Sequence, residues 1–340
     1  MTAPDHDGAS ISTAGAPRLM LLDTASLYFR AFHGMPDTLR SPDGHPVNAV
    51  RGLLDFIARL VSDHEATHLV ACWDNDWRPQ WRVELLPSYK THRVALPQPA
   101  SAAAEVVGAG GVGAESGVAE EAPDTLAPQV PWILESLAAL GIAVAGVDGF
   151  EADDVIATLA TRWGPECERV DVVTGDRDLF QLVDDDAGIR CLYTARGMSN
   201  LQVVDAAWVR EKYGIEPQRY ADFAALRGDT SDGIPGVAGV GEKTAATLVN
   251  EYADLGALVA AAADPAAKLS KAQRAKILAG VDYLAIAGEV VRTRRDLAVD
   301  LTLAECALPS APVDPAGFAA VVERLGLGSS AERVVAALGR

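Results

Sequence analysis

The sequence predicts an α/β fold in which a mostly parallel central sheet carries helices on both faces and is followed by a helical lobe. Two observations lead to this prediction. Short apolar runs typical of buried strands alternate with helical patterns up to about residue 203, and the strand pattern then disappears over residues 204–287, where short helices dominate. The chain has 340 residues, 49% of them apolar and 22% charged, so a sizeable core is expected and disorder of the whole chain is excluded.

Four strands and three helices can be placed in order along the first part of the chain. The strands are the apolar runs at residues 18–23, 67–74, 142–147 and 169–174. Apolar side chains recur every three or four residues at 47–61, and similar helical patterns occupy 131–140 and 153–163. Strands that alternate with helices are typical of a parallel sheet with helices on both of its faces.

The order of these patterns divides the chain into four parts. We expect a disordered N-terminal segment at 1–17, an α/β core at 18–203, a helical lobe at 204–303 and a C-terminal segment at 304–340. Within the core, an arch region at 77–126 contains a flexible insertion at 101–124. The insertion has five acidic residues, no Lys or Arg, and otherwise mainly Ala, Gly, Val and Ser.

The cysteines and the N-terminus indicate a reducing compartment. The four cysteines lie far apart without a CxxC pair, so neither a disulfide framework nor a zinc knuckle is indicated. The N-terminus lacks an arginine-rich start, and its first apolar run is too short for a signal peptide or a membrane span. We therefore expect a soluble cytoplasmic protein. Its net charge of -18 argues at first sight against a polyanionic partner.

Acidic residues follow every predicted strand, and a further pair opens the helical lobe. They are Asp23, Asp74, Glu151, Asp153, Asp154, Asp176, Asp178, Asp229 and Asp232. Ligands bind outside the carboxyl ends of the strands in open α/β sheets, so we expect these side chains to meet at one edge. A single acid after a strand can be an ordinary helix cap or turn residue, but nine gathered carboxylates are costly unless cations neutralise them. All-oxygen ligation favours Mg²⁺ or Mn²⁺ over zinc.

Other ligand motifs are missing from the sequence. It contains no GxxxxGK[ST] loop and no strand-linked GxGxxG with a downstream acid, so a nucleotide-binding enzyme is not indicated. Two hard divalent ions held by carboxylates suit an in-line displacement at phosphorus. The sequence therefore favours phosphoryl chemistry.

Two segments have the composition of nucleic-acid contacts. The first, at 233–245, is rich in glycine and then opens a helix, so its backbone could approach a phosphate closely, although such a turn is often just a tight corner. The second, at 77–93, interleaves basic and aromatic residues, which suits phosphate neutralisation and base stacking, although it also fits a solvated helix face with partly buried Trp. Its members are Trp77, Arg78, Trp81, Arg82, Tyr89, Lys90 and Arg93. Further basic runs are Lys268, Lys271, Arg274 and Lys276, and Arg292, Arg294 and Arg295.

These motifs resemble the 5′ nucleases, a family that includes the N-terminal nuclease domain of bacterial DNA polymerase I, phage 5′ exonucleases and flap endonucleases. The resemblance covers residues 18–303. It rests on DTASLYFRAFHG after the first strand, on EADD and TGDRD as central acids, on YKTHR as the start of a helical arch, and on GDTSDGIPGVAGVGEKTA as an acid pair leading into a helix-three-turn-helix. The resemblance implies a PIN-like core with an arch and that helical lobe.

The resemblance also implies roles for individual residues. It puts Asp23, Asp74, Glu151 and Asp153 at a first metal, and Asp153, Asp176, Asp178 and Asp229 at a second, with Asp154 and Asp232 outside the direct metal contacts. Lys90 and Arg93 are expected at the scissile phosphate with Tyr89 beside them, as catalytic residues. DNA contacts are expected from Phe29, Arg30, Arg82, Gly236, Gly239, Gly241, Lys243 and Thr244. The implied cofactors are two or three Mg²⁺ or Mn²⁺ ions and, in many members, a K⁺ at the helix-three-turn-helix.

The chain departs from the family pattern in two places. The acidic stretch at 101–124 stands where relatives have a shorter, more ordered segment, which affects the arch and strand threading. The familiar SDNIPG reads SDGIPG, with Gly233 in place of Asn, a change expected to touch turn stability more than metal binding. No polymerase domain follows, so we expect a free-standing nuclease.

The resemblance implies a structure-specific 5′-3′ exonuclease and 5′-flap endonuclease that leaves 5′-phosphate products in DNA replication and repair. Its partners would be DNA with 5′ ends, flaps or nicks, including RNA-primed DNA, at the nucleoid of the cytoplasm. Two alternatives remain at this point. One is an RNA endonuclease with a related acidic α/β core, and the other is a DNA-junction binding module without catalysis.

Overall fold

The computed structural model describes residues 15–94 and 123–339. Nearly all of the N-terminal segment 1–17, and the insertion 101–124 apart from its last two residues, lie outside the described residues. No helix in the described parts of the chain combines the length and apolar character needed to cross a membrane.

The core is built on one six-stranded sheet with strand order β3-β2-β1-β4-β5-β6. Its strands are β1 (Arg18–Asp23), β2 (His68–Cys72), β3 (Ala143–Ala145), β4 (Arg169–Thr174), β5 (Ile189–Tyr193) and β6 (Gln202–Val204). All neighbouring pairs are parallel except β5 with β6, which is antiparallel. The predicted mostly parallel α/β fold is therefore confirmed, and the sheet has two strands more than the four expected.

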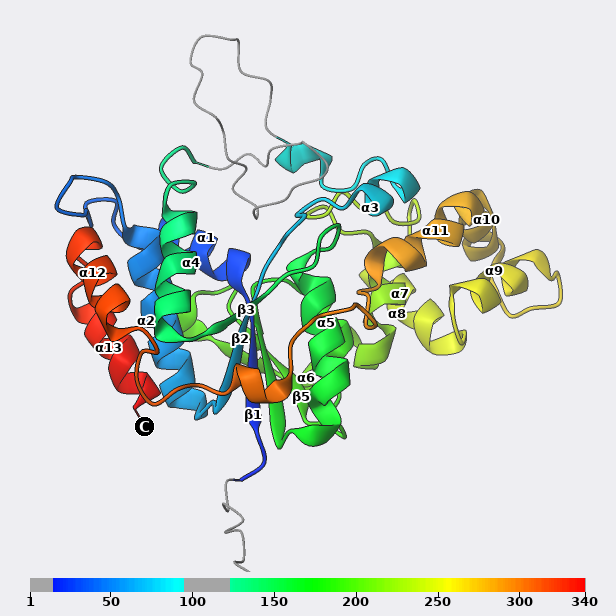
Figure 1. Cartoon of the computed structure of the whole chain (residues 1–340). Helices are drawn as coiled ribbons and strands as arrows, with labels where there is room; N and C mark the ends of the chain where they lie inside the picture. Colours follow the sequence, from blue (N-terminus) through cyan, green and yellow to red (C-terminus); the bar gives the residue numbers. More distant parts are fainter. Residues whose placement is uncertain (1–14, 95–122, 340) are drawn as a thin grey trace, which may run out of the picture.

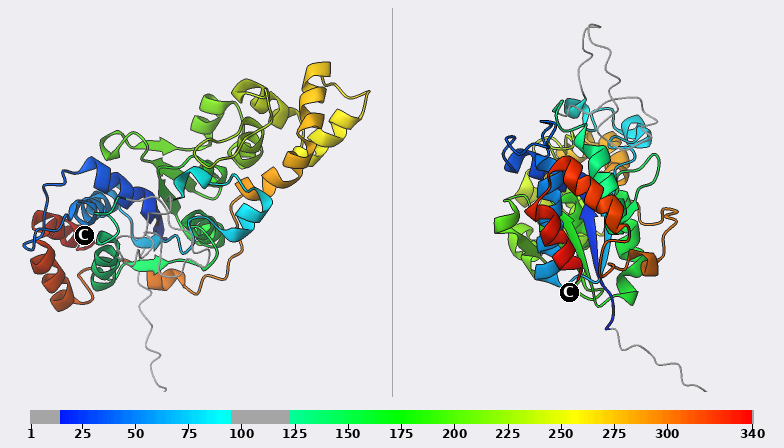
Figure 2. Two further views of the ribbon diagram at one scale, coloured as in Figure 1. Left: turned by 90° about the horizontal axis from the view of Figure 1, so that it is seen from above. Right: turned by 60° about the vertical axis from the view of Figure 1, so that its left-hand side comes forward.

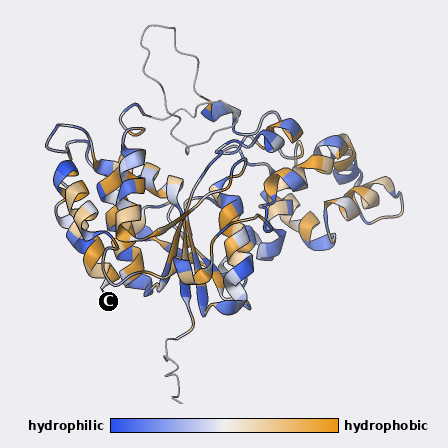
Figure 3. Cartoon of the chain, in the orientation of Figure 1, coloured by the Kyte–Doolittle hydropathy of each residue, from blue (hydrophilic) through white to orange (hydrophobic). Residues whose placement is uncertain are grey.

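Helices cover both faces of the sheet because its strands are apolar on both faces. Along β1, Leu19 and Leu21 belong to one hydrophobic cluster, whereas Met20 and Leu22 belong to the other. One face packs against α1 (Thr24–Gly34), α2 (Asn48–His64) and α4 (Gln129–Leu140), and the other against α5 (Ala152–Trp163) and α6 (Ala206–Tyr213). Figure 3 shows the apolar side of these helices turned toward the sheet. The period-two alternation along the strands thus divides the core into two layers.

The helical lobe continues from the second layer and projects away from the sheet (Figures 1 and 2). It contains α7 (Tyr220–Arg227), α8 (Glu242–Glu251), α9 (Leu255–Ala263), α10 (Lys271–Ala279) and α11 (Val281–Val291). The short helix α3 (Gln80–Leu85) contacts α11, so the base of the arch region lies against the lobe. After α11 the chain returns along the core, where the Arg162 guanidinium donates to the carbonyls of Leu297 and Val299.

The C-terminal segment folds back onto the layer that contains α1, α2 and α4. Helices α12 (Pro315–Leu325) and α13 (Ser329–Leu338) pack against α2 and α4, and they lie at the opposite end of the molecule from the helical lobe in Figure 1. Phe318, Leu325 and Val334 are buried in the same cluster as α2. The four cysteines, all of them described, are free.

Candidate active site

The main cleft lies at the carboxyl edge of the sheet, where the strand order reverses. The chain runs β1, β2, β3 in one direction and then returns to β4 on the other side of β1, so the loops after β1 and β4 diverge there. Such a switch point is where open α/β sheets bind ligands. A cavity of about 1160 Å³ occupies this position. Its lining includes Asp23, Asp74, Glu151, Asp153 and Asp176, as the sequence pattern predicted for this edge.

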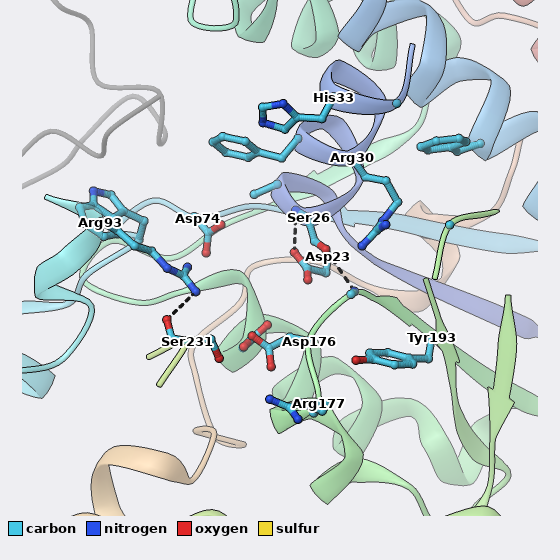
Figure 4. A pocket seen from close by; sticks show the side chains of 18 of the residues that line it. Asp23, Ser26, Arg30, His33, Asp74, Arg93, Asp176, Arg177, Tyr193 and Ser231 are labelled. Carbon is cyan, nitrogen blue, oxygen red and sulfur yellow. Dashed lines mark hydrogen bonds between the residues drawn. The ribbon is translucent and has the colours of Figure 1, made fainter. Parts of the chain in front are cut away.

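Local hydrogen bonds hold the first of these acids in place. Asp23 ends β1 and caps α1 by accepting from the Ser26 N–H (3.2 Å), and it also accepts from the Thr174 hydroxyl at the end of β4 (2.7 Å). Asp74 accepts from the Ala152 N–H at the start of α5 (2.7 Å). These acids therefore accept from the backbone at helix starts, as single acids after strands often do, and they also face one space, as expected for a carboxylate cluster (Figure 4).

Five of the nine carboxylates have no ion pair with a Lys or Arg in the described parts of the chain. We call them the open acids: Asp23, Asp74, Asp153, Asp176 and Asp178. Burial disfavours the charged form of a carboxyl group, and a neighbouring carboxylate adds to the effect. It raises the pKa of Asp23 to about 7, with Asp74 and Asp176 adding to the shift. Burial and then the charges of Asp23 and Asp176 raise the pKa of Asp153 well above its usual range.

Asp178 is, with Asp23, one of two buried open acids. It follows β4 in a short 3₁₀ turn (Asp178–Leu182), and its Oδ1 atom is buried without a hydrogen-bond partner. Burial, followed by the charges of Asp176 and Asp232, raises the pKa of this carboxyl well above its usual range. A buried oxygen that lacks both a donor and a counter-charge is costly, so Asp178 is suited to bind a cation.

The other four carboxylates form ion pairs with cations of the protein. We call them the paired acids: Glu151, Asp154, Asp229 and Asp232. Glu151 contacts Lys90 and Arg82 and also accepts from the Tyr89 hydroxyl (2.8 Å). Burial alone would raise the pKa of Glu151, but the charges of Lys90 and Arg82 outweigh it and hold the pKa below its usual range.

The remaining paired acids face arginines. The two carboxylate oxygens of Asp154 accept hydrogen bonds from the two Nη atoms of Arg82 (2.9 and 2.8 Å). Asp229 lies 3.3 Å from Arg177 and 3.2 Å from Arg227. Asp232 pairs with Arg93 at 3.1 Å, yet burial still raises the pKa of this carboxyl to about 6.

The donor set of the open acids fits hard divalent cations. Their ligand atoms are all carboxylate oxygens, which Mg²⁺ and Mn²⁺ prefer, and positive charge would relieve the repulsion that contributes to the raised pKa values of Asp23, Asp153 and Asp178. Among the described residues, no three acidic, histidine or cysteine side chains already converge in a finished coordination shell. The fit therefore rests on the chemistry of the donors and on the partnerless Asp178 oxygen.

Two cations of the arch base, Lys90 and Arg93, also line the cleft. Lys90 has a left-handed backbone (φ 48°), and its N–H donates to the Asp232 carbonyl (2.9 Å). The Arg93 guanidinium donates to the Ser231 carbonyl (3.0 Å) as well as to Asp232. Contacts between the arch base and the Asp229–Asp232 loop thus fix the backbone of Lys90 and the side chain of Arg93, while the Lys90 side chain binds Glu151.

Gly233 has a packing role in this contact. Its φ is +68°, and a Cβ at this position would overlap the Ser88 carbonyl oxygen. The Ser88 hydroxyl in turn donates to the Gly233 carbonyl (2.8 Å). The residue that departs from the family pattern therefore lets the arch base approach the loop closely.

The structure corrects the prediction that the segment at 77–93 offers a basic and aromatic DNA surface. Arg82, expected at the DNA, is only 3% exposed and bound on all sides by protein. Trp77 and Tyr89 are buried, so they are no stacking surface, and Tyr89 holds Glu151 instead of lining the cleft. Trp81 packs over the Arg82 guanidinium. The alternative of partly buried aromatics was closer to the structure.

The expected DNA contacts lie in two places. Phe29 and Arg30 line the cleft on α1, near His33 and Tyr193 (Figure 4). The glycine-rich turn before α8 is remote from them in the helical lobe. Gly236 makes a tight corner there, since a Cβ would overlap the Arg227 backbone. This agrees with the alternative that the glycine-rich turn is a tight corner of the chain. Gly241, Lys243 and Thr244 begin α8, where Gly241 and Lys243 are exposed, and Gly239 faces the Lys276 side chain.

The two later basic runs are mostly engaged within the protein. Arg274 donates to the carbonyls of Ala261 and Ala262 at the end of α9, and Lys276 donates to the Gly239 carbonyl (2.7 Å). Arg292 pairs with Asp222, and Arg294 pairs with Glu289. Exposed cations of these runs that the described chain leaves without an ion pair are Lys268, Lys271 and Arg295, and the Arg295 guanidinium donates to the Gln181 carbonyl (3.0 Å).

Sequence reasoning missed several residues that shape the cleft. Ser26 and Thr174 orient Asp23, and Arg177 lines the cleft beside Asp176. Ser26 had a readable signal, since it stands three positions after an acid that opens a helix. Arg177 stands between two of the predicted acids in the sequence and could have been included for that reason.

Comparison with known proteins gives consistent matches over most of the chain. The family model for the 5′-3′ exonuclease N-terminal resolvase-like domain matches residues 18–214, and that for the 5′-3′ exonuclease C-terminal SAM fold matches residues 215–314. A 5′-3′ exonuclease of Streptomyces coelicolor is 55% identical over 94% of this chain and 99% of its own length. DNA polymerase I of Mycobacterium tuberculosis is 40% identical over 89% of this chain but only 29% of the polymerase.

A solved structure has the same architecture. The T5 D15 protein co-crystallised with metal ions matches with a TM-score of 0.59 at 16% identity, over 94% of this chain and 98% of that protein. At this identity the likeness concerns the fold alone. It agrees with the six-stranded sheet and the projecting helical lobe described above.

Proposed function

Because the chain belongs to the 5′-3′ exonuclease family, we propose that it hydrolyses phosphodiesters at DNA 5′ ends and 5′-flap junctions and leaves 5′-phosphate products. The observation that supports this most directly is the composition of the cleft. Open acids suited to divalent cations lie beside Lys90 and Arg93, which suit a phosphate. We propose that this activity serves DNA replication and repair at the nucleoid of the cytoplasm.

The proposed metal ligands are the open acids together with Glu151 and Asp229. Two Mg²⁺ or Mn²⁺ ions held there would supply charge stabilisation and an activated water for in-line attack at phosphorus. We propose that Asp154 lies outside the metal contacts, and the hydrogen bonds that both of its oxygens accept from Arg82 support this. Asp232 has the same supporting role through Arg93.

The side chains of this chain bind and orient the phosphate. Lys90 and Arg93 offset the negative charge that develops on the phosphoryl oxygens, and their placement before substrate arrives lowers the reorganisation needed during reaction. Tyr89 acts indirectly, because its hydroxyl binds Glu151 and its ring lies 5.3 Å from the Lys90 ammonium. Phe29 and Arg30 are placed to meet the 5′ strand in the cleft.

The proposed division of labour assigns most of the chemistry to residues 18–203 and duplex binding to the lobe at 204–303, which also contributes Asp229 to the metal ligands. The start of α8, with Gly241, Lys243 and Thr244, is accessible to solvent. The backbone N–H groups at this helix start therefore suit a phosphate. A K⁺ at the same turn stays a prediction, which K⁺ titration of duplex binding would check.

The test is Mg²⁺-dependent digestion of end-labelled 5′-flap, nicked and blunt duplex DNA, with single-stranded RNA as a further substrate. Asp176→Ala should lower the flap cleavage rate by about 1,000-fold, since a metal ion is worth several kcal/mol in the transition state. Asp63→Ala is the matched control, because Asp63 is an exposed acid on α2 that pairs only with Arg59 among the described residues.

Three results would contradict the proposal. Asp176→Ala protein that is folded and cuts flap DNA as fast as wild type would remove the site assignment. Preferred cleavage of RNA would favour the RNA endonuclease. Flap binding without any Mg²⁺- or Mn²⁺-dependent cleavage would favour the junction-binding module.

A further inference from the structure

Arg82 has the most complete set of contacts of any side chain near the cleft, although it does not line the cleft itself. All of its guanidinium N–H groups have acceptors. Nε donates to the Val290 carbonyl (3.1 Å), Nη1 to Glu151 and Asp154, and Nη2 to Asp154 and, at 3.5 Å, to the Arg292 carbonyl. The Trp81 ring covers the guanidinium at 4.5 Å from its centroid, and the Tyr89 ring lies 5.8 Å away.

These contacts join three parts of the molecule that are far apart in sequence. Arg82 belongs to α3 at the base of the arch region, Glu151 and Asp154 lie at the start of α5, and the two carbonyls belong to the end of α11 and the residue after it in the helical lobe. Each carbonyl is more than 200 positions from Arg82 (separations of 208 and 210). Arg82 is therefore a direct polar link between the lobe and a carboxylate of the cleft.

The same link reaches Lys90 through Glu151. Arg82 and Tyr89 bind one carboxylate oxygen of Glu151, and Lys90 binds the other. Two cations and two acids, Arg82 with Lys90 and Glu151 with Asp154, thus form a buried group without net charge. If the guanidinium moved, the Glu151 carboxylate would lose the contact that fixes its rotation, and the Lys90 ammonium would move with it.

We propose that Arg82 is a positioning residue that aligns Glu151 and Lys90 and makes their alignment depend on how the end of α11 is seated. This inference rests on the proposed function of Glu151 and Lys90. It assigns to Arg82 no contact with DNA. When the helical lobe binds duplex, any displacement of α11 reaches the cleft through the Val290 and Arg292 carbonyls, which share one rigid guanidinium with Glu151.

An arginine is required for this role because its donors are planar and point in fixed directions. A lysine could keep the charge beside Glu151 and Asp154, but its single ammonium could not at the same time reach the Val290 carbonyl and both acids in the same geometry. Arg82→Lys therefore separates charge from alignment. Arg82→Met removes both and leaves two acids without this partner in the interior.

The experiment compares Arg82→Lys with wild type in single-turnover cleavage of a 5′-flap at saturating enzyme, and in flap binding with Ca²⁺ in place of Mg²⁺. Arg82→Lys should slow the maximal rate by about tenfold or more, as loss of supporting contacts around an active centre typically does, and should leave the flap dissociation constant within about twofold. Arg162→Met is the matched control. It removes arginine hydrogen bonds to the Leu297 and Val299 carbonyls of the same returning segment but reaches no acid of the cleft.

A double-mutant cycle distinguishes positioning from general support of the fold. If Arg82 acts through Lys90, Arg82→Lys should slow Lys90→Met protein much less than it slows wild type. Equal slowing in both backgrounds would overturn the proposal. So would a wild-type rate in Arg82→Lys, or a loss of flap binding as large as the loss of rate, which would return Arg82 to the DNA surface.

A readout without metal or substrate completes the test. Amide hydrogen exchange of residues 86–93 in EDTA should be faster in Arg82→Lys than in wild type, and unchanged in Arg162→Met. If Arg82→Lys fails to fold, Asp154→Asn replaces it, because this variant keeps Arg82 and weakens the hydrogen bonds between Arg82 and residue 154. It is expected to give the same pattern of exchange and rate. Unchanged exchange and rate in Asp154→Asn would overturn the proposal. Absence of cleavage by wild type would instead contradict the proposed function and leave the exchange result to decide on Arg82.

Discussion

The open acids and the paired acids lie side by side at one edge of the sheet but differ in their electrostatic surroundings. The paired acid Glu151 is held in its charged form by Lys90 and Arg82, and its pKa is lowered. For the open acid Asp153, burial and the charges of Asp23 and Asp176 outweigh that of Lys90, and its pKa is raised. Glu151 is buried and Asp153 is half-buried, so burial does not explain why the pKa of Asp153 is the one that is raised. The difference teaches that cations of the protein compensate the charge of the paired acids, whereas the open acids have no such partner among the described residues and are where we propose that divalent cations bind.

The strongest test of this comparison is a pair of substitutions that remove one charge from each group. Asp153→Asn and Glu151→Gln should both abolish most cleavage, by about 100-fold or more, since each removes a proposed metal ligand. Their effects on the free energy of unfolding in EDTA at pH 8 should have opposite signs. Glu151→Gln should lower it by about 3 kcal/mol because two buried cations lose their partner. Asp153→Asn should raise it by roughly 1 kcal/mol because repulsion is relieved.

Chemical denaturation of both variants in EDTA would measure these changes. Asp63→Asn, at an exposed position, serves as a control and should change neither cleavage nor stability. Destabilisation by Asp153→Asn of the same size as that by Glu151→Gln would show that the two groups do not differ in compensation.

A second test uses pH. The pKa of Asp23 is about 7 in the folded protein, above the value of about 3.9 in an unfolded chain, so the folded state binds the proton more tightly. The metal-free protein should therefore lose stability as pH rises from about 4 to about 7. Thermal unfolding in EDTA at several pH values would measure the slope. Asp23→Asn should flatten it, and saturating Mg²⁺ should reduce it by stabilising the charged form. A slope of the opposite sign would contradict the assignment of Asp23 to the open group.

The smallest expected effect tests how the paired group depends on the contact between the arch base and the Asp229–Asp232 loop. Gly233→Asn should lower the free energy of unfolding by roughly 1–3 kcal/mol, because the new Cβ overlaps the Ser88 carbonyl. Gly44→Asn is the control, since Gly44 has a similar backbone (φ +85°) with open space around it. If both variants lost the same stability, backbone conformation alone and not the close approach would explain the glycine.

The sheet and the acids could be predicted from sequence because their signals are local. Residues 18–23 and 169–174 coincide with β1 and β4, since each is a short, mainly apolar segment that ends at a polar residue. Strands β5 and β6 were not predicted. They are short, β6 has three residues, and each is recognised mainly by its neighbour in the sheet.

The partners of the acids could not be predicted in the same way. Nothing local to Arg82 distinguishes it from Arg93, yet one is buried against α11 and the other lines the cleft. The aromatic residues around Arg82 have the sequence pattern of a stacking surface. Their burial depends on the helical lobe, which begins far downstream in the chain, so the local sequence does not indicate it. The packing of α12 onto α4 and of α13 onto α2 had no sequence signal beyond helical periodicity.

The contact between Arg82 and the end of α11 also has a consequence for the order in which the chain is made. Synthesis runs from the N-terminus, so Arg82, Lys90 and Glu151 leave the ribosome well before Val290 and Arg292 supply the carbonyls that complete the guanidinium shell. Until then, nothing in the described structure satisfies the Nε–H of Arg82. On the proposed role of Arg82, a nascent core therefore carries its acids before their alignment is complete, and we expect competence for cutting DNA only once the last helix of the lobe has formed.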